Sequence, residues 1–336
     1  MASLRQYRPA MRTPESQLHA VNALTAANGV ASLKPVFLLG PTACGKTALA
    51  LALAEHIPLE IISVDSALIY RGMDIGTAKP SPEQQQETPH HLIDTLSPTE
   101  SYGAARFVTD ALQLIPKIRA CKRLPLLVGG TMLYAKALRE GLNALPPADA
   151  QVRAQVQAQA QQYGWQHLHA RLMQVDPITA TRLAPLDAQR IGRALEVYLQ
   201  TGKPLSAYHL EQKTGCDIPI ISLEPDRRAW LHERIEQRFD AMLEAGLVQE
   251  VQHLYQQAGI HAALPAMRCV GYRQVIDSME GRQPWQTLAM RGKAASRQLA
   301  KRQLTWLRGM QRHVVRCDAS FDAVLEQTQR RILLLQ

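Results

Sequence analysis

Gly40-Pro41-Thr42-Ala43-Cys44-Gly45-Lys46-Thr47 matches the pattern G-x-x-x-x-G-K-[ST] of a phosphate-binding loop. An apolar run at 35–39 precedes the loop and is typical of a buried parallel strand. A helix is predicted directly after the loop, from Lys46 to about His56. Because chance matches rarely have a strand before them and a helix after them, this context makes the pattern specific.

The residue types in this loop suit a diphosphate group. Its glycines allow backbone N–H groups to turn toward phosphate oxygens, and the positive end of the following helix adds to the attraction. Lys46 is predicted to neutralise a terminal phosphate, and Thr47 is predicted to bind Mg²⁺. Cys44 occupies a position that the pattern leaves open, so we interpret it as a small spacer.

Further apolar runs predict a parallel sheet. Runs at 61–64 and 124–128 indicate two more strands, and helical sequence lies between the runs. Strands that alternate with helices are typical of a parallel sheet with crossover helices. A fourth run at 218–223 is predicted to return the chain to the sheet, with Pro219 favouring an edge position. The predicted fold class is α/β, with a P-loop NTPase-like parallel sheet and flanking helices.

The chain is predicted to form one core with an insertion. Residues 141–215 are rich in Gln and Ala and indicate an inserted helical subdomain, whereas 35–140 and 216–336 form the core. Residues 1–34 have no continuous apolar segment and are predicted to be a flexible extension. Five scattered cysteines favour the reducing cytoplasm. No stretch approaches the roughly 18 apolar residues of a membrane span.

Two polar residues follow the predicted strands. Asp65 comes at the carboxyl end of the run 61–64, where open parallel sheets bind ligands. We predict that it faces the loop as a water-mediated Mg²⁺ ligand or a general base, or that it caps the following turn. Thr131, after Gly129-Gly130, is predicted to reach the same crevice. His90 and His91 have no third ligand at metal spacing and are predicted to form turn or surface structure.

The charge pattern favours a polyanionic partner. The formal charge is +9, although many basic proteins bind no nucleic acid. Residues 281–317 contain no Asp or Glu. On a helix, one face would carry cations and the opposite face apolar side chains, namely Arg297, Lys301, Arg308 and Arg312 against Leu299, Trp306 and Met310. Such a basic stripe suits the phosphates of a nucleic acid, and RCVGYR at 268–273 suits backbone contact and base stacking.

Together these motifs make the sequence similar to the tRNA dimethylallyltransferases, the isopentenyl-tRNA transferases of bacteria. The matching segments are GPTACGKT at 40–47, DSALIYRGMDIGTAKP at 65–80, PHHLID at 89–94, LVGGTMLY at 127–134, QRIGRALEVYLQTGKPLS at 189–206, RCVGYRQ at 268–274 and RQLAKRQLTWLR at 297–308. Cys44 departs from the Ala or Ser expected in the first of them.

The resemblance implies transfer of a dimethylallyl group from dimethylallyl diphosphate to N6 of adenosine 37 in tRNAs that read codons beginning with U. It implies Mg²⁺ as cofactor, and we expect a cytoplasmic monomer. In the implied roles, the loop at 40–47 binds the diphosphate with Lys46 as a catalytic residue, Asp65 accepts the N6 proton, and Thr131 assists. The departing diphosphate also needs an arginine, for which Arg234 and Arg238 are the candidates.

The resemblance and the basic surfaces also predict contacts to the tRNA anticodon stem-loop. The predicted contact residues are Asp65, Ser66, Ala67, Leu68, Thr131, Arg153, Gln189, Arg190, Ile191, Gly192, Arg193, Arg268, Cys269, Val270, Gly271, Tyr272, Arg273, Lys301, Arg302 and Arg308. Three other hypotheses remain at this point. The loop alone is compatible with a nucleotide or small-molecule kinase. An adenylate isopentenyltransferase would use the same donor to alkylate free AMP, but the basic stripe argues against it. The last hypothesis is a non-catalytic RNA-binding ATPase.

Overall fold

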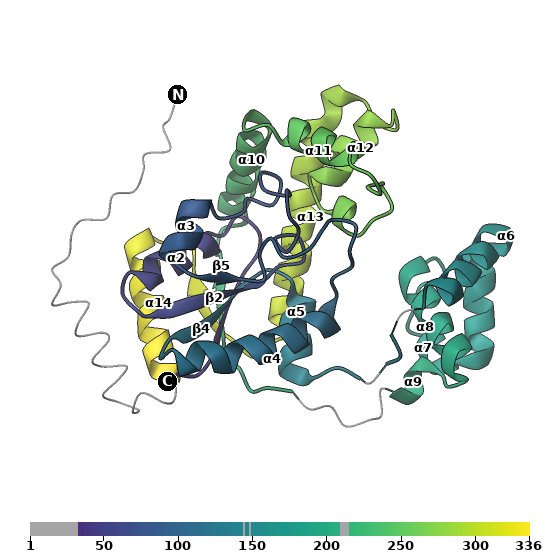
Figure 1. The fold of residues 1–336 in the computed structure, drawn as a ribbon, viewed down its shortest axis with the longest axis horizontal. Coiled ribbons are helices and arrows are strands. Elements are labelled where there is room, and N and C mark those ends of the chain that lie inside the picture. The colour runs from purple at the N-terminus through teal and green to yellow at the C-terminus, as the bar shows by residue number, and fades with distance from the viewer. Residues whose placement is uncertain (1–32, 144, 148, 209–214) are drawn as a thin grey trace. The chain divides into compact units, whose positions relative to one another are not determined.

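The computed structural model describes residues 33–143, 145–147, 149–208 and 215–336. They fall into two compact units, the first drawn from Met1–Arg139 and Asp217–Gln336 and the second from Glu140–Cys216 (Figure 1). Most of the predicted extension at 1–34 lies outside the described residues. Within the described ranges, no helix has the length and apolar character needed to cross a membrane.

The first unit is built on a parallel sheet, which confirms the predicted α/β class. In the described part of the chain the strands are β1 (Val36–Leu39), β2 (Leu59–Val64), β3 (His90–His91), β4 (Leu124–Gly129), β5 (Ile220–Glu224) and β6 (His313–Arg316). Their order is β3-β2-β4-β1-β5-β6, and every pairing is parallel. Because β2, β4 and β1 are neighbours, the segments that follow them meet at one edge of the sheet.

The outer strands correct two predictions and include one strand that was not predicted. The predicted edge position of β5 is wrong, since β5 lies between β1 and β6. Pro219 precedes β5, so its missing N–H costs no ladder bond, and its carbonyl accepts a hydrogen bond from the Phe37 N–H at 2.9 Å. His90 and His91, predicted to lie in a turn or on the surface, form β3 at the sheet edge beside β2. β6, at the other edge of the sheet, was not predicted.

Two helices cover one face of the sheet. Helix α2 (Lys46–Ala54) follows the phosphate-binding loop, and helix α14 (Phe321–Leu335) is the yellow helix at the C-terminus (Figure 1). Side chains that alternate along the strands point to one face. Leu38 and Leu126 accordingly share a buried apolar cluster with Leu49 of α2. This packing fixes the strand that leads into the loop and the helix that leads out of it.

The remaining elements of the first unit include helices that pack on the sheet and helices that pack on one another. They are α3 (Pro82–Glu87), α4 (Ala104–Ala120), α5 (Met132–Glu140), α10 (Arg228–Glu244), α11 (Leu247–Tyr255), η1 (Ala266–Arg268), α12 (Tyr272–Met279), η2 (Trp285–Thr287) and α13 (Leu288–Arg308). Helix α4 packs against β2 and β4, whereas α10 packs against α13. Gly292 permits the second contact, because a Cβ at this position would overlap the aromatic ring of Phe239 on α10.

The regular elements described in the second unit are all helices. Its helices are α6 (Ala150–Val175), α7 (Pro177–Ala180), α8 (Ala188–Thr201) and α9 (Leu205–Tyr208). Gly164 interrupts α6 with φ 80° and ψ 160°, a conformation that suits glycine. The resulting bend lets both halves of α6 contribute buried residues, such as Val156 and Leu168, to one core with Ile191 of α8.

Candidate active site

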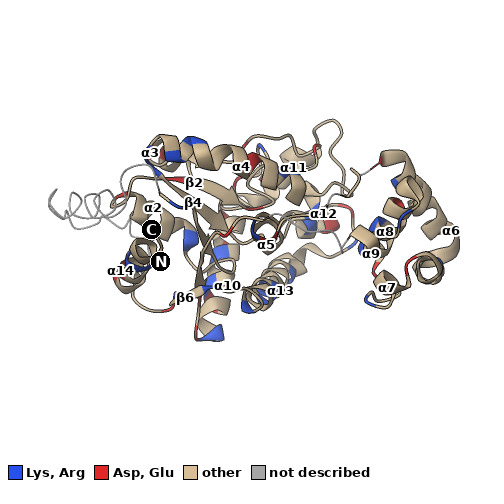
Figure 2. Ribbon diagram, turned by 90° about the horizontal axis from the view of Figure 1, so that it is seen from below, with Lys and Arg blue, Asp and Glu red and all other residues tan. Residues whose placement is uncertain are grey.

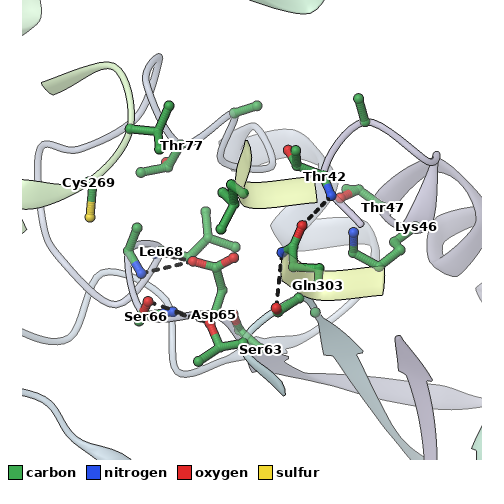
Figure 3. Close-up of a pocket in the computed structure, with 18 of the residues that line it drawn as sticks. Thr42, Lys46, Thr47, Ser63, Asp65, Ser66, Leu68, Thr77, Cys269 and Gln303 are labelled. Carbon is green, nitrogen blue, oxygen red and sulfur yellow. Dashed lines mark hydrogen bonds between the residues drawn. The ribbon is translucent and has the colours of Figure 1, made fainter. Parts of the chain in front are cut away.

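A cavity of about 560 Å³ opens where β1, β2 and β4 end. Its wall brings together residues from the phosphate-binding loop, the two neighbouring strand ends and two helices. Among them are Thr42, Lys46, Thr47, Ser63, Asp65, Thr131, Arg238 and Gln303. Figure 3 shows Lys46 and Thr47 on one side of this pocket and Asp65 with Ser66 on the other. The pocket therefore combines groups that attract phosphate with a carboxylate.

The phosphate-binding loop is held in shape by its own lysine. The Lys46 Nζ donates hydrogen bonds to the Gly40 carbonyl at 3.1 Å and to the Pro41 carbonyl at 2.7 Å. Gly45 takes a left-handed conformation with φ 93° at the start of α2, which favours glycine. The N-terminus of α2 consequently points into the pocket, where its positive end attracts anions.

Asp65 is oriented by the turn that follows it. Its Oδ1 accepts hydrogen bonds from the Ala67 N–H at 2.8 Å and the Leu68 N–H at 3.4 Å. The turn-capping role considered from the sequence is thus present, and it leaves Oδ2 without a hydrogen bond to the described residues. Thr131 supports the same turn, since its Oγ1 accepts from the Ser66 N–H at 3.1 Å. One carboxylate oxygen is held in place and the other is available to a ligand.

The two candidate arginines lie differently. Arg238 lines the pocket and donates to the Thr77 carbonyl at 3.2 Å. Burial lowers the pKa of Arg238, while the nearby Asp65 carboxylate acts in the opposite direction. Arg234 does not line the pocket, and its Nε donates to the Ala43 carbonyl at 2.9 Å. Arg238 is therefore placed to contact a bound anion, and Arg234 supports the loop from outside.

Ser63 is a pocket residue that the sequence analysis missed. It lies on β2 two residues before Asp65, so both side chains point to the same face of the strand. Its hydroxyl is buried and has no hydrogen-bond partner among the described residues. A buried polar atom without a partner is costly, which suggests that a bound ligand or ion satisfies it. The sequence could have indicated this position, because residues 61, 63 and 65 alternate along the strand and therefore face the same side.

Glu250 anchors the long loop that follows Asp65. Its carboxylate, on α11, accepts hydrogen bonds from the backbone N–H groups of Asp74, Ile75 and Gly76 at 3.0, 2.7 and 3.1 Å. A carboxylate that accepts several backbone N–H bonds makes strong charge-assisted interactions. This contact fixes the segment that presents the Thr77 carbonyl to the pocket.

The basic stripe on α13 is arranged differently from the prediction. Trp306 was expected on a packed apolar face, but it is 41% exposed and lines the pocket. The buried side chains of α13 are those of Leu288, Ala300 and Leu307. Met310 and Arg312 lie beyond the end of the helix. The assumed helical face was wrong because the packing partners, α10 and α12, approach from another side.

Most cations of this segment are already paired. The ion pairs are Arg282 with Asp277 and Glu280, Lys293 with Asp240, Arg297 with Glu236, Arg312 with Glu224 and Arg316 with Asp226. The acids come from α10, from α12 and β5, and from the residues shortly after these last two elements, so the absence of acids within 281–317 did not reveal them. Lys301, Arg302 and Arg308 are exposed and make no ion pair with the described residues. Figure 2 shows several Lys and Arg positions along α13 in blue.

Some residues of the segment at 268–273 line the pocket, and others are buried in the core. Arg268, Cys269 and Val270 line the pocket. Tyr272, predicted to stack on a base, is 0% exposed, and its hydroxyl donates to Glu250 at 2.5 Å. That prediction is wrong, because the ring is needed to pack against Gly76 and Leu247. Arg273 is exposed and lies 3.9 Å from Asp277.

The predicted contact residues of the second unit also differ in exposure. Arg153, Gln189 and Arg190 are exposed. Ile191 is 0% exposed and packs in the core of the unit, so its side chain is not available to a partner, which corrects its predicted contact. Arg193 is half-buried and donates to the Pro146 carbonyl at 2.6 Å. Gly192 is buried against Trp165.

Cys44 belongs to the phosphate-binding loop, and its buried side chain lies against the thiol of Cys317. Burial raises the pKa of Cys44, but the hydrogen bond with Cys317 and the Lys46 ammonium, 3.7 Å from Sγ, outweigh it and lower the pKa to about 6. The same hydrogen bond raises the pKa of Cys317. Cys44 also fills the space beside Gly40, where a Cβ would come within 2.7 Å of its sulfur.

We expect the ultraviolet thiolate absorbance of the folded protein to rise with a midpoint near pH 6, because the pKa of Cys44 is lowered from 9.0 to about 6. Removing the hydrogen-bond donor in Cys317→Ala should move this midpoint upward, and Cys44→Ala should abolish it. The exposed Cys121 provides the control, since Cys121→Ala should leave the transition in place. A midpoint that Cys317→Ala does not move would contradict the assignment.

A protein-family model described as IPP transferase matches residues 68–310. The chain belongs to the IPP transferase family. Proteins named tRNA dimethylallyltransferase are similar over most of their length. The one from Acidovorax sp. (strain JS42) is 57% identical, over 87% of this chain and 94% of its own length. The one from Burkholderia pseudomallei (strain 668) is 53% identical, over 90% and 96%.

Solved structures of IPP transferases agree with this family assignment. The tRNA isopentenylpyrophosphate transferase of Bacillus halodurans is 36% identical, with a TM-score of 0.66 over 90% of this chain and 96% of that one. A eukaryotic dimethylallyltransferase acting on tRNA is 25% identical, with a TM-score of 0.73 over 90% and 78%. The resemblance drawn from the motifs is confirmed, as is the P-loop type of fold.

Proposed function

We propose that this enzyme transfers the dimethylallyl group of dimethylallyl diphosphate to N6 of adenosine 37 in the anticodon stem-loop of tRNAs reading codons that begin with U. The observation that carries the proposal is the pocket in which the phosphate-binding loop faces Asp65, in a chain of the IPP transferase family. We propose that it acts as a monomer.

The leaving group is bound by the loop at 40–47. As the C–O bond to the diphosphate breaks, its electron pair passes to the leaving oxygen and negative charge grows there. Lys46, the N-terminus of α2 and Arg238 surround this position with positive charge. Donors that are already in place stabilise such developing charge more than water does. Lys46 would exchange its present carbonyl partners for phosphate oxygens.

The residues of the pocket fit a magnesium ion. Mg²⁺ prefers oxygen ligands and retains several waters. Thr47 and Asp65 offer oxygens to the pocket, and the buried Ser63 hydroxyl lacks a partner among the described residues. We propose that Thr47 would hold the ion, with the Ser63 hydroxyl available to its waters, while Asp65 keeps its free oxygen for the base role. When bound, the ion would neutralise the charge of the leaving diphosphate.

Asp65 is the proposed general base. The N6 nitrogen forms its bond to the allylic carbon from the side opposite to the leaving oxygen, and it must lose a proton. The Oδ2 of Asp65 can accept that proton while Oδ1 remains bound to the Ala67 N–H. Thr131 keeps this turn in position through Ser66. The carboxylate thus acts on the amine without leaving the turn that orients it.

The tRNA is proposed to lie against the rim of the pocket formed by Arg268 and α13. Lys301, Arg302 and Arg308 would contact its phosphates, while Arg153, Gln189 and Arg190 of the second unit are proposed as further contacts. Adenosine 37 must leave its stack to reach the pocket, which costs a few kcal/mol. Contacts to the backbone would offset this cost.

Trp306 is expected to add a stacking contact at this rim. It is exposed, lines the pocket and has its ring centroid 5.8 Å from the Lys136 ammonium. Because stacking of a base on an aromatic ring contributes about 1–3 kcal/mol, Trp306→Ala should weaken tRNA binding by that amount, and Trp306→Phe should lose less. Filter binding or fluorescence anisotropy would measure it. Trp285→Ala is the matched control, since Trp285 is 43% exposed but lies outside the pocket wall.

A direct assay tests the proposed function. The purified protein should transfer a labelled dimethylallyl group to tRNA that carries A36-A37-A38, and mass spectrometry should locate the added mass at position 37. A kinase would instead transfer phosphate from ATP without tRNA, and an adenylate isopentenyltransferase would modify free AMP. Failure to bind dimethylallyl diphosphate, together with tight binding of ATP, would overturn the proposal.

A further inference from the structure

One side chain of α13 touches the backbone of two site segments. The Gln303 Oε1 accepts a hydrogen bond from the Thr42 N–H at 2.8 Å, and its Nε2 donates to the Gly130 carbonyl at 2.9 Å (Figure 3). Reversing the amide would set acceptor against acceptor and donor against donor, so the hydrogen-bond network fixes its orientation. A single amide therefore joins the loop after β1 to the segment after β4.

The two hydrogen bonds of Gln303, here called the bridge, connect the loop to the turn that holds the proposed base. Gly130 is followed by Thr131, whose Oγ1 accepts from the Ser66 N–H next to Asp65. Hydrogen bonds and short stretches of backbone thus run without interruption from the diphosphate loop, through Gln303, to the turn that holds the carboxylate. Nothing else described in the pocket wall bonds to the backbone of both segments through one side chain.

The surroundings of Gln303 leave little freedom. Gly130 has no side chain, and a Cβ at this position would collide with the Gln303 amide nitrogen. Ser296, Leu299 and Trp306 lie on the same side of α13 and also line the pocket. Gln303 is therefore part of a continuous helical wall, and the amide is held at the place where the two segments approach each other.

We propose that Gln303 is a positioning residue that fixes the separation between the leaving-group loop and the Asp65 side of the pocket. This inference rests on the proposed transfer reaction. In a displacement at carbon, the leaving oxygen and the attacking nitrogen must lie on opposite sides of one atom. A misplacement of about 1 Å costs on the order of 10²-fold in rate, even when both groups still bind. Gln303 acts through the two segments and contacts neither reacting atom.

Gln303→Met tests the proposal, because methionine has a similar length but neither bonds to Thr42 nor donates to Gly130. We expect kcat to fall by about 10-fold to 100-fold. KM for dimethylallyl diphosphate and the Kd of magnesium pyrophosphate should stay close to those of the wild type. Gln298→Met, an exposed position on the same helix, should leave all three unchanged. Amide exchange at Thr42 should become faster in Gln303→Met alone.

Gln303→Glu separates the two halves of the bridge. Its carboxylate still accepts from the Thr42 N–H but no longer donates to the Gly130 carbonyl, so we expect a similar loss of kcat with amide exchange at Thr42 unchanged. An unaltered kcat in both variants would overturn the proposal, as would pyrophosphate affinity that falls in step with kcat in Gln303→Met, which adds no charge. Inactive wild-type protein would instead refute the proposed function, since the variants are scored against an active parent.

Discussion

Replacing Asp65 with asparagine is expected to slow dimethylallyl transfer by about 10²-fold to 10⁴-fold, the usual contribution of a general base. Asparagine keeps an oxygen that accepts from the Ala67 N–H, so the turn should remain folded. It has no oxygen that takes up a proton. Single-turnover transfer to tRNA, with donor and tRNA both saturating, isolates this step from binding.

Two controls distinguish loss of the base from loss of structure. Asp217 is exposed and outside the pocket wall, so Asp217→Asn should transfer at the wild-type rate. Asp65→Asn should retain the thermal midpoint of the wild type and its affinity for pyrophosphate. Rapid transfer by Asp65→Asn would rule out Asp65 as the base and leave it the cap of its turn.

Arg238→Met should lower kcat by about 10²-fold to 10³-fold, comparable to the loss of one charge-stabilising donor in other acyl- or group-transfer sites. The reason is that Arg238 lines the pocket and keeps its positive charge there, bonded to the Thr77 carbonyl. Methionine preserves much of the apolar stem but removes the guanidinium. The measurement is kcat for transfer together with the Kd of magnesium pyrophosphate.

Arg234→Met is the informative comparison, because Arg234 lies one helical turn away and bonds to the outside of the loop. It should reduce kcat much less than Arg238→Met. Arg228→Met, at an exposed position on the same helix, should have no effect. If Arg234→Met instead reduced kcat more than Arg238→Met, the diphosphate would have to lie on the other side of the loop.

The parts of the fold that were predictable are those specified by local sequence. The loop at 40–47 is defined by its own glycines and lysine, and β1, β2 and β4 are largely apolar, buried runs. β3 has two residues and β6 is half exposed, so neither shows such a run. β5 was misplaced because Pro219 was judged inside the strand, whereas the strand begins after it.

The remaining site residues depend on contacts between distant segments. Gln303 meets Thr42 across 261 positions of the chain, and Glu250 meets Asp74 across 176. The residue types glutamine and glutamate do not by themselves indicate a hydrogen bond to the backbone of a distant segment. The periodicity of α13 also gave no indication of which face packs, since Ala300 and Gly292 are buried while Trp306 is exposed. Small residues on a helix are a weak hydrophobic signal but allow close helix packing.

The ion pairs between α10 and α13 affect how RNA binding depends on ionic strength. Each phosphate neutralised by a free cation releases condensed counterions, and the number released sets how steeply added salt weakens binding. Lys293 and Arg297 are already neutralised by Asp240 and Glu236, so they release few. RNA affinity should therefore decline less steeply with added salt than the cation content of α13 implies. The formal charge of the protein determines how strongly it attracts RNA at long range. The salt dependence of the RNA-binding equilibrium is determined by the smaller group of cations that are not in ion pairs.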